Sequence, residues 1–342
     1  MAQQIHHLAE VKHPKSVDGW FVSDAPLPEE PLERLVYYAR LAPSSHNSQP
    51  WKFLLGAGEI DVFADLGRWL KVADPLRREL HASIGCAIES LRIAGDYAQF
   101  GSSVKYFPID GDDTLVARVS IALQGPKRSL PAASLLEHMI TRRTSHREFD
   151  RARPVSDEDR KALYRSVEVG DVSLQFLQER PQLLALAELE ESADRKLFAN
   201  PAYREELARG VGDGALGTSW LMSTLGRFAV GHLPVGHQVA KDDAARLASS
   251  PLVGLLTTRG DQAVDAVQAG EAYMRLALMA ESRGLRVQPV SQILEVEETR
   301  AEAAKLFGLG GRVAQHLFRI GHAEPEQGPH QRRPLAELLV KT

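Results

Sequence analysis

Two polar runs, one early in the chain and one later, carry residue types that could bind a flat phosphorylated ring. The first is PSSHNSQPW, residues 43–51. Its Asn47 and Gln49 each offer donors and acceptors, which suit the imide-like edge of a heterocycle. Two prolines restrict the loop backbone, while Ser44 and Ser45 are small enough to let a ring approach closely. We therefore expect a ring-binding loop here, with an ordinary turn after a helix as the alternative.

The second run, RRTSHR at residues 142–147, has the composition of a phosphate site. Arginine forks match phosphate oxygens in pairs, and small hydroxyls fill the remaining directions. Arg143, Thr144 and Ser145 provide this set in consecutive positions. By itself such a run is more typical of a solvated basic turn. Together with the first run, it predicts one flavin mononucleotide (FMN) site assembled from two halves of a single polypeptide.

Helix and strand patterns alternate along the chain, and these elements must position the two runs. Apolar residues at helical spacing predict a helix over residues 32–39, which Pro43 ends. A longer apolar helix is expected over about residues 78–100. Alternating and β-branched residues predict strands at 52–55 and 59–64, near 104, at 116–123, at 172–177, at 252–257 and at 316–321.

A weak internal repeat relates the two halves of the chain. Residues 83–91 (SIGCAIESL) match residues 268–276 (QAGEAYMRL) in pattern, and each stretch begins a helix that is apolar on most sides. Helices of this kind are buried, so we expect the two to face each other in the core. The repeat predicts a first half over residues 1–130 and a second over residues 131–342, although generic helical patterns also match by chance.

The second half carries a glycine-rich insertion at about residues 195–245. Dense glycine argues against a regular scaffold, whereas the aromatic and aliphatic residues in the segment argue against disorder. Because long loops in compact domains are commonly functional, we expect a lid, with an interface arm as the alternative. The candidate lid or substrate contacts are Trp220, Met222 and Phe228, together with His46 of the first run.

The bulk composition argues against several other functions. Of the 342 residues, 44% are hydrophobic and 25% are charged, and the net charge is -4, which gives no electrostatic reason to expect nucleic acid or an anionic membrane as partner. The single cysteine, Cys86, is expected to be a core residue in a reducing compartment. Glu188, Glu190 and Glu191 resemble a solvated helix face. No apolar run reaches membrane-spanning length, so we expect a cytoplasmic protein. The histidines lack metal spacing, so we expect no metal site.

Four segments resemble the flavin-binding elements of the nitroreductase superfamily. They are APSSHNSQPWKF (42–53), RRTSHREF (142–149), GLRVQPVSQ (284–292) and RRPL (332–335). In ordinary nitroreductases the arginine motif precedes the loop within one subunit, and a homodimer builds two sites. Here the loop comes first, and the second half has no copy of it, since residues 167–176 read VEVGDVSLQF. The chain thus resembles the tandem, Acg-type proteins, in which a fused dimer keeps one site.

This resemblance implies an α+β, nitroreductase-like fold. Two tandem halves would form an intramolecular pseudo-dimer, with a mainly antiparallel sheet in each half. Because such a chain already buries its dimer interface, we expect a monomer in solution. The resemblance implies one FMN per chain, and FMN contacts at Ser44, Ser45, Asn47, Gln49, Arg143, Thr144, Ser145, Arg147, Pro289, Val290, Ser291, Arg332 and Arg333.

Within that set, the resemblance implies distinct roles. Arg143 and Ser145 would bind the phosphate, with Thr144 in support and Arg332 or Arg333 closing the other side. Arg147 would lie at the N1 and O2 edge of the ring. A backbone N–H near Ser291 would reach flavin N5, and Pro289 and Val290 would flank the ring. His46 and His146 are expected to line the site rather than to act as catalysts.

The function implied is that of an FMN-dependent NAD(P)H oxidoreductase. Hydride would pass from NADH or NADPH through flavin N5 to a nitroaromatic, a quinone or a similar small acceptor. Because the flavin carries out the chemistry, no side chain is expected to be catalytic. The alternative is an FMN-sequestering protein with a covered flavin and little turnover. The sequence does not distinguish NADH from NADPH or identify the acceptor.

Overall fold

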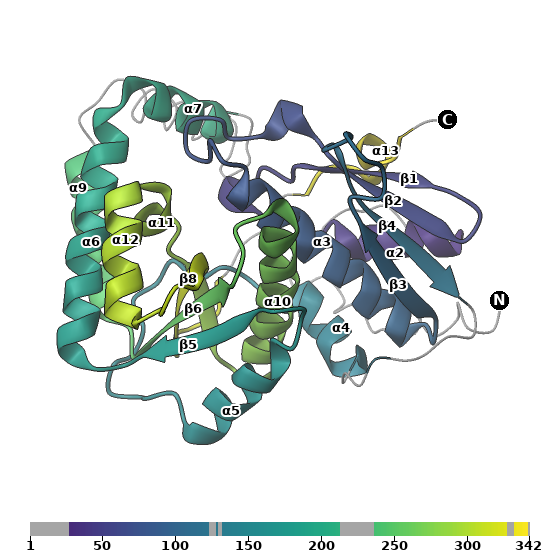
Figure 1. The fold of residues 1–342 in the computed structure, drawn as a ribbon. Coiled ribbons are helices and arrows are strands. Elements are labelled where there is room, and N and C mark those ends of the chain that lie inside the picture. The colour runs from purple at the N-terminus through teal and green to yellow at the C-terminus, as the bar shows by residue number, and fades with distance from the viewer. Residues whose placement is uncertain (1–26, 123–127, 129–131, 213–235, 327–331, 341–342) are drawn as a thin grey trace.

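The computed structural model describes residues 27–122, 128, 132–212, 236–326 and 332–340. Within these residues, each half of the chain contributes one four-stranded sheet. The long helices α3 (Arg78–Tyr97) and α10 (Ala263–Ser282) pack against each other between the two sheets (Figure 1). This is the α+β architecture with two tandem halves that the sequence predicted.

The two sheets have the same topology. Their strand orders are β1-β2-β4-β3 and β5-β6-β8-β7, and all neighbouring strands are antiparallel. Each sheet shifts register at the equivalent place, after Val62 in the first and after Leu256 in the second. The internal repeat is therefore confirmed. The strands are β1 (Trp51–Leu55), β2 (Glu59–Ala64), β3 (Gly101–Tyr106), β4 (Leu115–Ala122), β5 (Ser173–Leu177), β6 (Leu252–Thr258), β7 (Arg286–Pro289) and β8 (Val313–Gly321).

The helices α3 and α10 cross at a pair of glycines. A Cβ atom on Gly85 would lie 1.9 Å from the carbonyl oxygen of Val267, and a Cβ atom on Gly270 would lie 1.9 Å from that of Ala82. Only glycine permits such a close approach of two helix backbones. The contacts are reciprocal and the glycines occupy equivalent positions in the repeat. The two halves therefore meet across an approximate two-fold axis.

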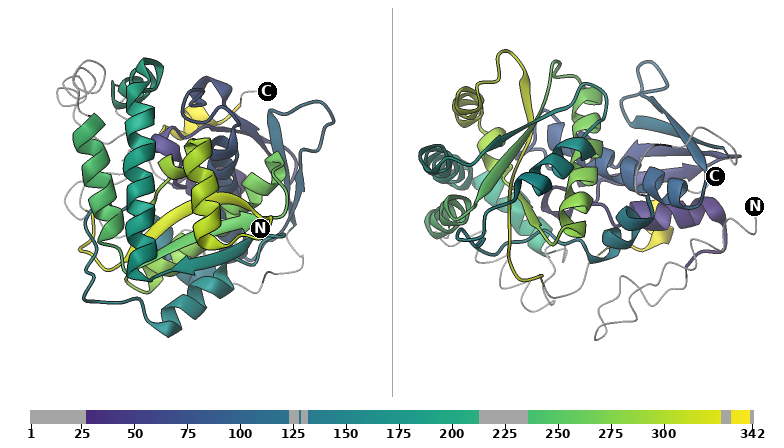
Figure 2. Two further views of the ribbon diagram at one scale, coloured as in Figure 1. Left: turned by 60° about the vertical axis from the view of Figure 1, so that its left-hand side comes forward. Right: turned by 90° about the horizontal axis from the view of Figure 1, so that it is seen from below.

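Helices cover the second sheet on both faces. The face opposite α10 packs against α6 (Arg180–Ala199), α11 (Gln292–Glu295) and α12 (Glu297–Phe307), as Figures 1 and 2 show. All residues of β6 are consequently buried, which explains its nearly continuous apolar sequence LVGLLTT. In the first sheet, β2 instead alternates buried and part-exposed residues, as its sequence pattern predicted.

The insertion expected to be an irregular lid begins and ends in helices. The helix α6 ends at Ala199 and is followed by α7 (Pro201–Gly212), while α9 (Gly236–Ala248) closes the segment and packs along α6. The expectation of irregular structure is therefore wrong for both ends of the insertion, because α6 and α9 bury apolar residues together. Its centre lies outside the described residues, including the lid candidates Trp220, Met222 and Phe228.

The acidic stretch of α6 is not simply a solvated face. Glu188 is exposed, but Glu190 and Asp194 are only 2% and 0% exposed. They lie one helical turn apart, and their carboxylate oxygens are within 4.8 Å of each other and of Asp243 on α9. Burial, followed by the charge of Asp243, raises the pKa of Asp194 to about 7. The expectation for Glu190 was wrong because this face of α6 is covered by α9.

Segments of the second half return to contact the first. Leu339 pairs in parallel with Phe53 of β1, and the Val340 N–H donates to the Phe53 carbonyl oxygen at 2.8 Å.

None of the helices in the described part of the chain is long and apolar enough to cross a bilayer. The remaining helices are α2 (Pro31–Ala39), α4 (Ala132–Thr141), α5 (Asp157–Ser166), α13 (Leu335–Leu338) and the 3₁₀ turns Ser45–Asn47 and Leu66–Arg68.

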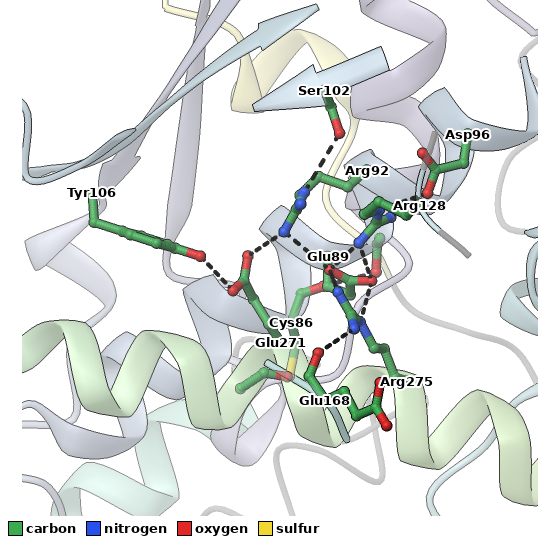
Figure 3. A network of polar contacts seen from close by, with 12 residues as sticks. Cys86, Glu89, Arg92, Asp96, Ser102, Tyr106, Arg128, Glu168, Glu271 and Arg275 are labelled. Atoms are coloured by element: carbon green, nitrogen blue, oxygen red, sulfur yellow. Dashed lines mark hydrogen bonds and ion pairs between the residues drawn. The ribbon is translucent and has the colours of Figure 1, made fainter. Parts of the chain in front are cut away.

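A buried network of ion pairs connects α3 with α10 (Figure 3). Glu89 of α3 is 0% exposed and accepts a hydrogen bond from the Nε of Arg275 on α10 at 2.7 Å. Arg128 donates to both oxygens of the same carboxylate, at 2.7 and 2.8 Å. Arg92 lies 3.6 Å from Glu89 and 3.4 Å from Glu271 on α10. Charged groups from both halves thus meet around one fully buried carboxylate.

Candidate functional site

A cavity of about 350 Å³ lies where the two halves meet. Its walls come from residues 43–47, the first turns of α3, residues 142–144 and 146, the middle of α10, and the end of β7 with the chain after it. The first half therefore supplies the ring-binding loop, and the second half supplies the arginine run. The structure brings together the two runs that the sequence singled out.

Three arginines converge on this cavity. Arg142, Arg143 and Arg332 all line it, and the hydroxyl-bearing Thr144 lies beside them. Burial and the charge of Arg142 lower the pKa of Arg143 to about 10. Burial, followed by Arg142 and Arg143, lowers the pKa of Arg332 to about 9. These shifts show that the cations repel one another in a poorly solvated place, and a bound anion would relieve that repulsion.

Arg142 adds a second sign of an anion site. It is only 4% exposed, and its Nε has no hydrogen-bond partner among the residues that the structure describes. A buried guanidinium donor left unsatisfied is costly. Arg142 lies in the RRTSHR run but was not among the residues expected to contact FMN. Its selection would have required knowing which way the side chain leaves the end of α4.

The ring-binding loop is held in an uncommon backbone conformation. His46, Asn47 and Gln49 have φ values of 47°, 52° and 50°, in the left-handed region that non-glycine residues rarely adopt. Arg332 Nη1 donates to Asn47 Oδ1 at 2.8 Å, and the Gln49 N–H donates to Ser44 Oγ at 2.9 Å. Such conformations persist only where the surroundings fix them, and they are common at ligand sites.

Most of the residues predicted from the sequence line the cavity. His146, expected only to line the site, does so as well. The lining residues that were predicted as FMN or substrate contacts are Ser44, Ser45, His46, Asn47, Arg143, Thr144, Pro289, Ser291 and Arg332. The predicted contacts outside the lining are Gln49, Ser145, Arg147, Val290 and Arg333.

Gln49 and Arg333 bind each other instead of facing the cavity. The Gln49 side chain accepts from the Arg333 backbone N–H at 2.8 Å. Arg333 Nη1 in turn donates to the Gln49 carbonyl at 3.1 Å and to Asp65 at 3.2 Å. These two residues therefore anchor the returning C-terminal segment behind the loop, and Arg332 is the arginine of the pair that reaches the cavity.

From Thr144 onward, the second run alternates between facing the cavity and facing away from it. Thr144 forms a parallel bridge with Val287, so the backbone here is extended and successive side chains point to opposite sides. Ser145 is 0% exposed, and its hydroxyl donates to Glu326 at 3.3 Å. The Arg147 side chain is 48% exposed, with Nε 3.6 Å from Glu326. Neither Ser145, expected at the phosphate, nor Arg147, expected at the ring edge, is among the residues that line the cavity.

Val290 is a core residue. Its backbone N–H donates to the Leu317 carbonyl at 2.8 Å, and its side chain packs in the apolar cluster under α6 and α12. Its neighbours Pro289 and Ser291 do line the cavity. This segment therefore approaches the cavity in the expected place, but the alternation of its side chains turns Val290 away.

Several neutral side chains that the sequence analysis missed complete the wall. Tyr273 and His316 pack with ring centroids 4.3 Å apart, and burial lowers the pKa of His316 to about 4. Cys86, expected to be a plain core residue, lines the cavity with its thiol 3.2 Å from the Gly270 carbonyl oxygen. Burial raises the pKa of that thiol, so it stays protonated. Uncharged aromatic and sulfur groups of this kind suit a flat neutral ring.

Two carboxyl groups, Glu79 and Glu295, also line the cavity. Ser291 Oγ donates to Glu79 Oε2 at 3.1 Å, a hydrogen bond between the two halves. Neither glutamate lies in a motif, and they are far apart in the sequence. Only the helix ends that carry them, α3 and α11, bring them to the same cavity.

Comparisons with known proteins connect this geometry to one family. Residues 20–71, which include the ring-binding loop, match the Nitroreductase family. The chain is 27% identical over 333 residues to the "Putative NAD(P)H nitroreductase Rv3131" of Mycobacterium tuberculosis, covering 90% of each chain. It is 26% identical over 323 residues to the "Putative NAD(P)H nitroreductase acg" of the same organism, covering 90% of this chain and 95% of the relative.

The solved structures that resemble this chain are more distant. A nitroreductase with bound FMN from Desulfitobacterium hafniense is 17% identical, with a TM-score of 0.39, and the match covers 61% of this chain and 98% of that one. An NADPH:FMN oxidoreductase from Vibrio harveyi, complexed with NAD+, is 16% identical with a TM-score of 0.36, over 59% of this chain and 72% of that one.

Proposed function

Since this chain is a nitroreductase-type oxidoreductase of the superfamily's Acg-like group, we propose that its cavity binds one FMN for NAD(P)H-dependent reduction of a small acceptor. The observation that carries the proposal is the convergence of Arg142, Arg143 and Arg332 on one cavity. Three cations that line one cavity, Arg142 buried and Arg143 and Arg332 half-buried, suit the phosphate of a mononucleotide.

The remaining lining residues fit the rest of FMN. Thr144 would add a hydroxyl to the phosphate group, and Asn47 would contact the polar edge of the ring or the ribityl chain. Tyr273 and His316 offer flat neutral surfaces to the ring, and Ser291 closes the opposite wall. When bound there, FMN would supply hydride transfer at N5. The residues of this chain would orient it and keep water away.

The structure also supports a single flavin per chain. By the offset that aligns the repeat, Glu271 takes the position of Cys86, and Tyr106 takes that of Ser291. The cavity therefore has two small side chains where the equivalent place on the other side of the pseudo-dimer has two large ones. In that place Tyr106 donates to Glu271 at 2.6 Å (Figure 3). We infer that these side chains, with Arg92, fill the place of a second flavin. A pseudo-dimer with one site needs no second copy, so we expect a monomer.

The proposed function predicts that NADH or NADPH reduces the bound flavin. The test is anaerobic mixing of FMN-reconstituted protein with each nucleotide, with free FMN at the same concentration as the control. We expect the visible flavin absorbance to bleach in the protein well before it bleaches in the free FMN. If the yellow colour persists with both nucleotides, the chain retains FMN without turning it over, and the oxidoreductase proposal fails.

A further inference from the structure

Two carboxyl groups from different halves line the cavity, and their surroundings differ. Glu79 of α3 accepts a hydrogen bond from Ser291 at 3.1 Å, and its Oε1 lies 3.3 Å from the Arg78 guanidinium. Glu295, at the end of α11, has neither kind of contact at Oε2. That oxygen is buried and has no hydrogen-bond partner among the residues that the structure describes. Glu79 thus has a hydroxyl donor and a guanidinium beside it, whereas Oε2 of Glu295 has neither.

Two neighbouring carboxyl groups in a poorly solvated place do not both ionise. Burial, followed by the charge of Glu79, raises the pKa of Glu295 well above its ordinary value. Asp74 and Asp194 act in the same direction, and Arg78 alone opposes them. These causes favour the protonated form of Glu295, which lines the cavity with an oxygen that has no other described partner.

The other titratable groups of the cavity do not supply a proton near neutral pH. Desolvation lowers the pKa of His46, His146 and His316, which favours the neutral imidazole in each. Burial raises the pKa of Cys86 and of Tyr273, so both retain their protons.

We propose that Glu295 is the catalytic proton donor to the acceptor. The proposal rests on the proposed function and adds the residue that completes its second half-reaction. Reduction of a quinone to a hydroquinone requires two electrons and two protons. One hydrogen arrives with both electrons as hydride supplied by the reduced cofactor. The other arrives as a proton from the Glu295 carboxyl, whose O–H bond breaks as the quinone oxygen gains its O–H bond. The Glu295 carboxylate then regains a proton from water.

The variant Glu295→Gln separates proton donation from shape and charge. Glutamine has the size of the protonated acid and is likewise neutral, but it cannot release a proton. The reconstituted holoprotein is photoreduced anaerobically and mixed with benzoquinone, which requires protons, or with ferricyanide, which takes up electrons alone. We expect the benzoquinone rate to fall by about 100-fold and the ferricyanide rate to change less than about twofold. The matched control is Glu297→Gln, an exposed residue next to α11 that should leave both rates unchanged.

The pH profile gives a second measure. Because only the protonated acid donates, the wild-type benzoquinone rate should fall as pH rises through the raised pKa of Glu295, whereas the residual rate of Glu295→Gln should lack that step. In the flavin-free protein, infrared difference spectra of wild type against Glu295→Gln should contain the carbonyl band of a protonated carboxyl group at neutral pH. This second readout does not depend on turnover.

The outcomes are distinguishable. An unchanged benzoquinone rate in Glu295→Gln, an equal loss with both acceptors, or carboxylate bands in place of the protonated carbonyl band would each overturn the role of Glu295. If instead reduced wild-type protein fails to react with either acceptor, the oxidoreductase function itself fails. The infrared result then still decides whether Glu295 carries a proton.

Discussion

Glu89→Ala is expected to reduce the free energy of unfolding by about 3–5 kcal/mol, the usual cost of removing one partner from a buried ion pair. The carboxylate is 0% exposed and joins Arg275 of the second half to Arg128 and Arg92 of the first. Its removal leaves the buried Arg275 without its carboxylate partner, while Arg92 keeps Glu271 and Arg128 keeps Asp96. Urea unfolding at pH 7 measures the change.

A surface pair provides the matched control for this prediction. Glu59 lies 3.6 Å from Arg118, with its side chain 46% exposed. Glu59→Ala should therefore cost less than about 1 kcal/mol. If Glu89→Ala costs no more than Glu59→Ala, the network does not hold the two halves together.

The effect of Glu89→Ala should depend on pH. Burial alone would raise the pKa of Glu89, but Arg128, Arg275 and Arg92 outweigh it, and the pKa is lowered. A carboxylate with a lowered pKa contributes stability above its unfolded pKa of about 4.3, and the contribution is lost as pH falls through the folded pKa. The difference between wild type and Glu89→Ala should therefore be largest near neutral pH and shrink in acid.

The second large effect concerns the cofactor. Arg143→Ala should weaken FMN binding by about 1.5–3 kcal/mol, roughly 10- to 150-fold, because a charge-assisted phosphate bond is lost. Arg147→Ala is the matched control, since Arg147 lies outside the cavity beside Glu326 and should change FMN affinity less than about twofold. Titration by quenching of flavin fluorescence measures both.

Riboflavin, which lacks the phosphate, distinguishes a lost phosphate contact from a damaged cavity. Arg143→Ala should bind riboflavin about as well as wild type does. A loss of the same size for riboflavin and FMN would mean that Arg143 shapes the cavity without contacting phosphate. A loss in Arg147→Ala as large as that in Arg143→Ala would restore the original assignment of Arg147.

The fold was largely predictable because the repeat and the strand patterns are local. Alternation in β2 and the apolar helices around Gly85 and Gly270 were sufficient to predict two related halves with buried central helices. The insertion was less predictable, since its glycines suggested irregular structure while α6 and α9 bury apolar faces that become apparent only when the two helices pack. Glu190 was misjudged for the same reason.

The site was predictable as two segments but not side chain by side chain. Ser145 and Arg147 lie in the correct run, yet the extended backbone at Thr144 turns them away from the cavity. Glu79 and Glu295 could not be found from spacing, because residues distant in the sequence meet only through the packing of the two halves.

The central claim is that one cavity, formed by both halves, holds a single FMN. The most direct measurement is the flavin content of protein that has been saturated with FMN, desalted and denatured. One FMN and no FAD per chain is the predicted result. Two flavins per chain would show that the place equivalent to the cavity, which contains Tyr106 and Glu271, is also a flavin site. FAD or no retained flavin would contradict the assignment of the arginine cluster to a mononucleotide phosphate.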